Sequence, residues 1–169
     1  MSGLLNLGMA LFPEKINDRY AMISRQDKEN LFLMYSDDIY KWEYPDLLRI
    51  PEEPWEFVQI GNNGSPIKTD YGWLLLTHGV GALRRYCMGA VLLDSNDPSR
   101  ILAVLKSPFI WPDEKERNGY VPNVVYSCGG LIHNGSPVVP YAVSDTSSKI
   151  AVLSVDELIR GMDKIKHPK

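Results

Sequence analysis

The sequence predicts an all-β protein built from β-propeller blades, with one short helix near its C-terminal end. Three observations carry this prediction. Most apolar residues occur in short runs rich in Val, Ile, Tyr and Leu that Gly, Pro, Asn or Asp interrupt, which is a β pattern. Only one segment has helical periodicity. A proline-led unit recurs, because Pro13, Pro66 and Pro122 are spaced 53 and 56 residues apart.

Each unit repeats the same order of elements. A proline-containing segment leads through a polar turn into an apolar strand, and the unit closes with another strand and an acidic turn. A period near fifty residues with about four short strands matches the size of a propeller blade. We therefore expect one partial propeller domain over residues 1–169, with repeats at about 9–50, 60–112 and 119–156. The expected strands include Tyr20–Ser24, Asn30–Tyr35, Trp73–Thr77, Tyr86–Leu93, Asn123–Cys128, Leu131–His133, Val138–Val143 and Ile150–Leu153.

The helix is expected at about 155–165. Leu158, Ile159 and Met162 share one helical face there, and Ile165 follows one turn later. Ser154 is a suitable N-cap, since Glu157 lies three residues further on, as in a capping box.

Three blades are an unusual number, because propellers close with about four to eight blades. Three would leave sheet faces and strand edges uncovered, and uncovered edges recruit partners. We therefore expect either a homo-oligomer or a missing N-terminal half. The competing interpretation is an ordinary antiparallel sandwich in which the prolines recur by chance.

Composition excludes several classes of protein. The chain has 18 Lys and Arg against 21 Asp and Glu, a formal net charge of −3, so no basic field favours nucleic acid or anionic lipid. No apolar run approaches the roughly 18 to 20 residues that span a bilayer, and the N-terminus lacks the features of a signal peptide. We expect a soluble, cytoplasmic chain whose two cysteines, Cys87 and Cys128, are reduced core thiols.

Several motifs, taken in order, resemble the β-mannoside phosphorylases and β-1,2-mannosidases of glycoside hydrolase family 130. The resemblance extends from about Gly8 to the terminal helix. It rests on Leu11–Ile16, Gly64–Thr69, Gly72–Val80, Asp97–Arg100, Gly119–Gly129 and Tyr141–Thr146.

The resemblance implies a five-bladed propeller with a sugar site in its central funnel, of which this chain would hold about three blades. It implies an inverting reaction on a β-mannoside, with inorganic phosphate as a possible co-substrate and no other cofactor. Family members are about twice as long, and their general-acid aspartate lies in a motif like Glu-Asp-Pro-Arg. Asp97-Pro98 belongs to a blade turn instead, so no residue here takes the catalytic acid role.

A bound phosphate needs cations, and the resemblance places its ligands in two of the matching motifs. Lys68 follows the first strand of its blade and His78 ends the next, so we expect the two to converge at the funnel mouth. Lys15 is a third candidate. The alternatives are a solvated turn lysine for Lys68 and a strand-end cap for His78.

The sugar-binding candidates follow from the same motifs. One of Arg84 and Arg85 is expected to reach the ligand, since neighbours in an extended segment point to opposite faces. Tyr86 is a candidate stacking surface, although packing is its commoner role. Asp145 matches the family position that hydrogen-bonds mannose hydroxyls, and an Asx turn is its alternative.

No metal site is expected, because His78, His133 and His167 lack metal-ligand spacing. The favoured function is a carbohydrate-active protein that supplies the sugar- and phosphate-binding half of a mannoside phosphorylase or glycosidase site. The alternatives are a noncatalytic sugar-binding or assembly module and a structural propeller segment that pairs with itself.

Overall fold

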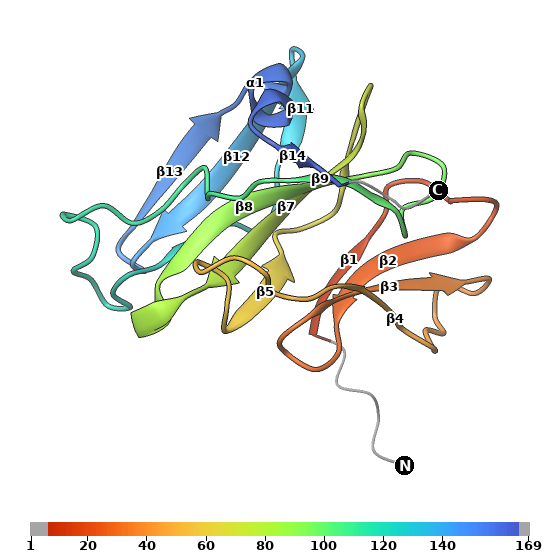
Figure 1. Cartoon of the computed structure of the whole chain (residues 1–169), viewed down its shortest axis with the longest axis horizontal. Coiled ribbons are helices and arrows are strands. Elements are labelled where there is room, and N and C mark those ends of the chain that lie inside the picture. Colours follow the sequence, from red (N-terminus) through yellow and green to blue (C-terminus); the bar gives the residue numbers. More distant parts are fainter. Residues whose placement is uncertain (1–6, 166–169) are drawn as a thin grey trace.

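A computed structural model describes residues 7–165, and it confirms an all-β fold with one short α-helix. Three antiparallel sheets lie in sequence order (Figure 1). They are separate sheets rather than the two packed sheets of a sandwich, and they do not close into a ring. The first sheet has the simplest topology, with its strands side by side in chain order: β1 (Leu7–Leu11), β2 (Tyr20–Arg25), β3 (Leu31–Ser36) and β4 (Asp46–Arg49).

In both the second and the third sheet, the first strand is broken into two short segments. In each of them two short segments pair, one after the other, with the same long strand. The second sheet contains β5 (Gln59–Asn62), β6 (Ile67–Thr69), β7 (Gly72–Val80), β8 (Tyr86–Leu93), β9 (Ile101–Val104) and β14 (Asp163–Lys164). The third contains β10 (Val125–Tyr126), β11 (Leu131–His133), β12 (Ser136–Val143) and β13 (Ser147–Val152).

The breaks in these first strands bring two sheets together. Gly64 lies in the break between β5 and β6, and a Cβ atom there would collide with the backbone oxygen of Cys128, in the break between β10 and β11. Gly64 also has φ +79°, a conformation that glycine adopts at little cost. The inner edges of the second and third sheets therefore meet backbone to backbone.

Two apolar layers hold the sheets together, and alternate residues of β7 serve one layer each. Trp73 and Leu75 pack toward the first sheet with Ile23 and Leu33, while Leu74 and Leu76 pack toward the third with Val139. All four β7 side chains are buried. This is why the segment is apolar throughout rather than alternating: the second sheet is covered on both faces.

The helix is shorter than predicted. α1 (Val155–Arg160) begins as expected, with the Ser154 hydroxyl accepting from the Glu157 N–H at 3.3 Å. It ends at Gly161, and Asp163–Lys164 then pairs with β9 as a strand instead of continuing to residue 165. Met162 and Leu158 are still buried in the layer between the second and third sheets, so core packing satisfies the apolar periodicity although the helix does not continue beyond Arg160.

The outward face of the third sheet is apolar as well. Because paired residues in adjacent strands share a face, Leu131, Val138 and Val152 lie together, and Ile150 pairs with Pro140 on the same side. Leu131, Ile150 and Val152 are 59%, 70% and 68% exposed. Within residues 7–165 no helix has the length and apolar character required to cross a bilayer.

Candidate functional site: a buried histidine and arginine at the inner sheet edges

His78 lies near the end of β7, on the face that looks toward the third sheet. It pairs with Met88 of β8 and with Gly61 of β5. A Cβ atom on Gly61 would occupy the position of the His78 ring, so the glycine leaves room for the imidazole. Only 3% of His78 is exposed. The sequence therefore places a polar ring in a site from which water is almost excluded.

Both ring nitrogens of His78 have protein partners. Nδ1 lies 2.9 Å from Oδ1 of Asn63, whose Nδ2 donates to the Thr77 carbonyl at 3.2 Å and so fixes the orientation of the amide. Nδ1 must then carry the proton, and Nε2 accepts from Nη1 of Arg25 at 3.2 Å. Burial, with the Arg25 charge as a smaller cause, lowers the pKa of His78 from 6.5 to about 3. The ring is neutral at neutral pH.

Arg25 ends β2 and reaches from the first sheet to the second. Nη1 also donates to the Gln59 carboxamide oxygen at 2.8 Å when that oxygen faces it. Its Nε atom is buried and finds no acceptor among residues 7–165. The ion pairs formed within the same residues do not include Arg25. A half-buried guanidinium without a carboxylate partner is a candidate site for an anion.

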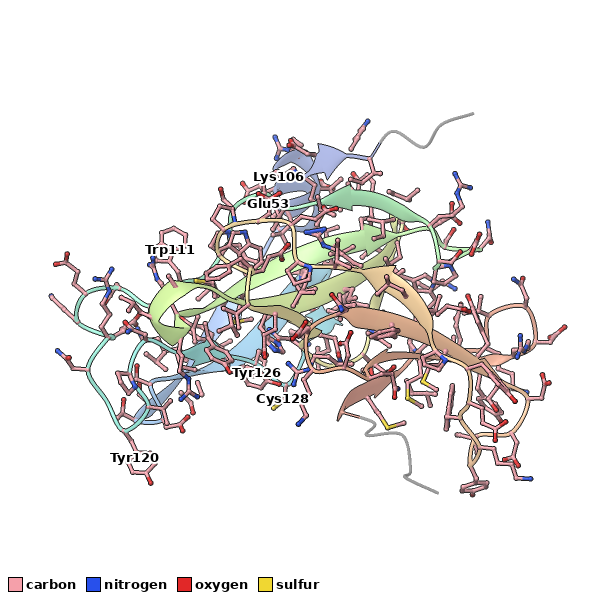
Figure 2. The ribbon with its side chains drawn as sticks, turned by 60° about the horizontal axis from the view of Figure 1, so that its bottom comes forward. Glu53, Lys106, Trp111, Tyr120, Tyr126 and Cys128 are labelled. Carbon is pink, nitrogen blue, oxygen red and sulfur yellow. The ribbon has the colours of Figure 1, made fainter. Side chains whose placement is uncertain are left out.

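Two tyrosines enclose this group. The ring of Tyr86 stacks on His78 with centroids 6.0 Å apart and planes inclined by 14°, and Tyr126 approaches from β10 at 5.0 Å. Burial raises the pKa of the Tyr126 phenol, so it stays protonated at neutral pH. Figure 2 shows Tyr126 and Cys128 near the middle of the molecule. We call Arg25, Gln59, Asn63, His78, Tyr86 and Tyr126 the His78 cluster.

The structure does not bring Lys68 to His78, contrary to the expected convergence. Lys68 pairs with Trp73 at the start of β7, five residues before His78. Its amino group forms an ion pair with Glu14 and lies 5.5 Å from the Trp73 ring centroid. Lys15 is exposed, with its amino group 4.3 Å from the Tyr20 ring centroid. Phosphate binding by these two lysines remains a prediction.

The two arginines of the β7–β8 turn diverge. Arg84 has φ +53° and is exposed in the short 3₁₀ turn Ala82–Arg84. Arg85 points to the face of the second sheet opposite Tyr86, where it donates through Nη2 to the Pro112 carbonyl at 3.4 Å. Neither arginine contacts His78 in the part of the chain described.

Asp145 lies at the tip of the β12–β13 hairpin. Ser144 and Asp145 both have positive φ, 49° and 51°, and the Thr146 N–H donates to the Val143 carbonyl, as in a type I′ turn that favours Asp. The Asp145 residue is exposed. Its carboxylate has no hydrogen-bond or ion-pair partner within residues 7–165, so it is free to bind a ligand.

Sequence reasoning missed four members of the cluster, Arg25, Gln59, Asn63 and Tyr126. A signal for Arg25 was present, because Arg25 and His78 are 53 residues apart, the same interval as Pro13 and Pro66. They occupy equivalent places in successive repeats, each after the apolar run of its second strand. No group of three or more His, Cys, Asp or Glu side chains in the described range could hold a metal ion.

Comparison with known proteins identifies the relatives of this chain. A family model described as beta-1,4-mannooligosaccharide phosphorylase, that of glycoside hydrolase family 130, matches residues 4–164. A 1,2-beta-oligomannan phosphorylase of Thermoanaerobacter sp. is 37% identical over 155 residues, which are 90% of this chain and 52% of the relative. A beta-1,2-mannobiose phosphorylase of Listeria innocua is 32% identical over 165 residues, 94% of this chain and 46% of the relative.

Solved structures agree. The complex of the Listeria innocua beta-1,2-mannobiose phosphorylase with beta-1,2-mannobiose superposes with a TM-score of 0.85 at 32% identity, and the match covers 93% of this chain and 46% of that one. A glycosyl hydrolase of Bacteroides ovatus superposes with a TM-score of 0.75 at 22% identity, which shows a shared fold. The chain spans about half the length of the curated relatives it matches.

Proposed function

Because the chain belongs to glycoside hydrolase family 130, we propose that it supplies the sugar- and phosphate-binding half of a mannoside phosphorylase site. The general acid would come from the half of the fold that this chain does not span. The substrates would be a β-mannoside or a similar small oligosaccharide and inorganic phosphate, with no further cofactor. The setting would be the cytoplasm, where the free thiols of Cys87 and Cys128 stay reduced.

The observation that carries this proposal is Arg25 without a carboxylate partner. Removing a cation from water costs free energy unless an opposite charge replaces the lost hydration. His78 cannot share the charge, because its pKa near 3 keeps it neutral, and it holds Nη1 in place through Nε2. A phosphate dianion would supply the missing charge and accept from the remaining guanidinium N–H groups.

In phosphorolysis with inversion, a phosphate oxygen bonds to the anomeric carbon while the glycosidic C–O bond breaks on the opposite face. The leaving oxygen takes a proton from a general acid. Arg25 would orient the phosphate, and His78 would act as a positioning residue for Arg25. Tyr86 and Tyr126 would form an aromatic wall beside the reacting sugar.

Asp145 is proposed to accept hydrogen bonds from mannose hydroxyls. It lies at the same end of the sheets as Tyr86, because Tyr86 N–H donates to the Asn123 carbonyl at 2.9 Å and Ser144 N–H donates to the Val124 carbonyl at 2.8 Å. The exposed carboxylate and the aromatic ring are thus linked through neighbouring strands.

Calorimetric titration with inorganic phosphate tests the anion site. Arg25→Met keeps the aliphatic packing and removes the charge, so phosphate affinity should fall about 10- to 100-fold, on the scale of about 1.5–3 kcal/mol for a charge-assisted hydrogen bond. Arg19→Met is the matched control, because it removes an exposed arginine that is paired with Asp37 and should leave affinity unchanged. Equal phosphate affinity in wild type and Arg25→Met would exclude Arg25 as the ligand.

The second candidate is a noncatalytic sugar-binding or assembly module, favoured by the exposed apolar outer face of the third sheet. It predicts sugar binding without phosphorolysis. Supplying the N-terminal half of the Listeria innocua relative and assaying mannose 1-phosphate from β-1,2-mannobiose separates the two: product favours the phosphorylase, and binding without product favours the module.

A further inference from the structure

A pocket lies on the face of the second sheet that is opposite to His78. It has a volume of about 500 Å³, within the range of small-molecule sites. Its walls include Trp55, Trp111, Arg85 and Cys87. Arg85 and Tyr86 are neighbours in an extended segment, so one side chain faces this pocket while the other stacks on His78. The pocket and the His78 cluster are therefore separate.

Two glycines seat Trp55 in the pocket wall. A Cβ atom on Gly79 would lie 2.5 Å from the Trp55 ring, and one on Gly89 would collide with the same ring. The indole Nε1 donates to the Lys106 carbonyl at 3.0 Å, and the Lys106 amino group forms a 2.7 Å ion pair with Glu53. Figure 2 shows Glu53 and Lys106 close together. The ring is thus held in place before any ligand arrives.

Trp111 forms an exposed part of the wall. It is 51% exposed although its own loop is anchored to β8, where the Met88 N–H donates to the Ile110 carbonyl at 2.8 Å. An indole that a fixed loop holds partly in water offers a flat apolar surface to a ligand. Figure 2 shows Trp111 at the periphery of the molecule, apart from Tyr126.

The polar groups of the pocket lie beside this aromatic surface. Arg85 has one long hydrogen bond, to the Pro112 carbonyl, and its Nε atom has no acceptor within residues 7–165. Ser107 adds a hydroxyl. A pyranose ring matches this combination, because its C–H face packs on the electron-rich face of an indole while its hydroxyls accept from a guanidinium.

We propose that the pocket formed by Trp55, Trp111 and Arg85 binds one sugar residue of a mannooligosaccharide, at a site separate from the His78 cluster. The choice of a mannooligosaccharide rests on the proposed function. The pocket itself rests on the geometry of the second sheet.

Tryptophan indole resonances provide the test, since the chain has four tryptophans and two lie outside the pocket. Titration of the ¹⁵N-labelled protein with β-1,2-mannotetraose should shift the indole N–H signals of Trp55 and Trp111 and leave those of Trp42 and Trp73 in place. Trp111→Ala should weaken tetraose binding at least fivefold and abolish the Trp55 shift. Tyr120→Ala is the control, because Tyr120 is an aromatic residue of the same inter-sheet loop, 87% exposed, that points away from the body (Figure 2).

Absent shifts at Trp55 and Trp111, or an unchanged affinity in Trp111→Ala, would overturn the pocket. A parallel titration with phosphate separates this result from the proposed function. If the wild-type chain shows the tryptophan shifts with tetraose but does not bind phosphate, the anion site alone is refuted. Phosphate binding that depends on Arg25, without tryptophan shifts, would refute the pocket alone.

Discussion

The buried imidazole of His78 should make stability depend on pH in a way that one substitution removes. Its folded pKa of about 3 lies below the 6.5 of an unfolded histidine, because burial and Arg25 disfavour the charged ring. Between these two values the unfolded chain binds more protons, so the free energy of unfolding rises with pH and its full value is reached above about pH 6.5. At pH 5 the unfolded state gains about 2 kcal/mol from protonating this one group.

His78→Gln removes the titration while leaving an oxygen that can accept from Arg25. Urea unfolding of both proteins at pH 7.5, 6 and 5 measures the difference in free energy of unfolding, and titrating carboxylates cancel because both proteins contain them. Wild type should lose about 2 kcal/mol relative to the variant between pH 7.5 and 5. Parallel stability curves would mean that the folded chain takes up this proton as readily as the unfolded chain, so the pKa of His78 would not be lowered and the hydrogen-bond assignment to Asn63 and Arg25 would be wrong.

Two further predictions concern packing and association. Gly79→Ala should lower the free energy of unfolding by about 1–3 kcal/mol, because the new methyl group overlaps the fixed Trp55 ring. Urea unfolding measures this change, and a variant as stable as the wild type would disprove the tight contact. Ile150→Lys should weaken self-association through the apolar outer face of the third sheet while changing stability by less than about 0.5 kcal/mol. Sedimentation velocity measures this, and a wild-type chain that sediments as a stable monomer would contradict the expected oligomer.

The all-β class could be predicted from the sequence because short apolar runs and turn residues determine strands and turns through local interactions. The Asn17–Asp18 turn, with both residues at positive φ, forms where a polar turn was expected. The end of the helix was not predictable in the same way. Whether the chain continues as helix after Gly161 depends on β9, which offers its edge to Asp163 and Lys164 from far away in sequence.

The candidate site was predictable only in part. His78 and Tyr86 were identified and the structure stacks them together. Lys68 was expected beside His78. The register between β6 and β7 instead places Lys68 opposite Trp73, and the order of the motifs in the sequence does not determine that register. Arg25 belongs to the first sheet and His78 to the second. Their contact depends on how the two sheets pack together, which the sequence alone does not give.

The small strand β14 has a consequence for the order in which this chain can fold during synthesis. The first sheet is complete once residue 49 has left the ribosome, but the outermost strand of the second sheet is made of residues that follow the whole third sheet and α1. The edge of β9 must therefore stay open while the later segments are translated, and an open edge is where nascent chains pair wrongly. A stop codon just after α1 would leave that edge permanently exposed, so the loss of β14 should harm solubility more than the length of this two-residue strand suggests.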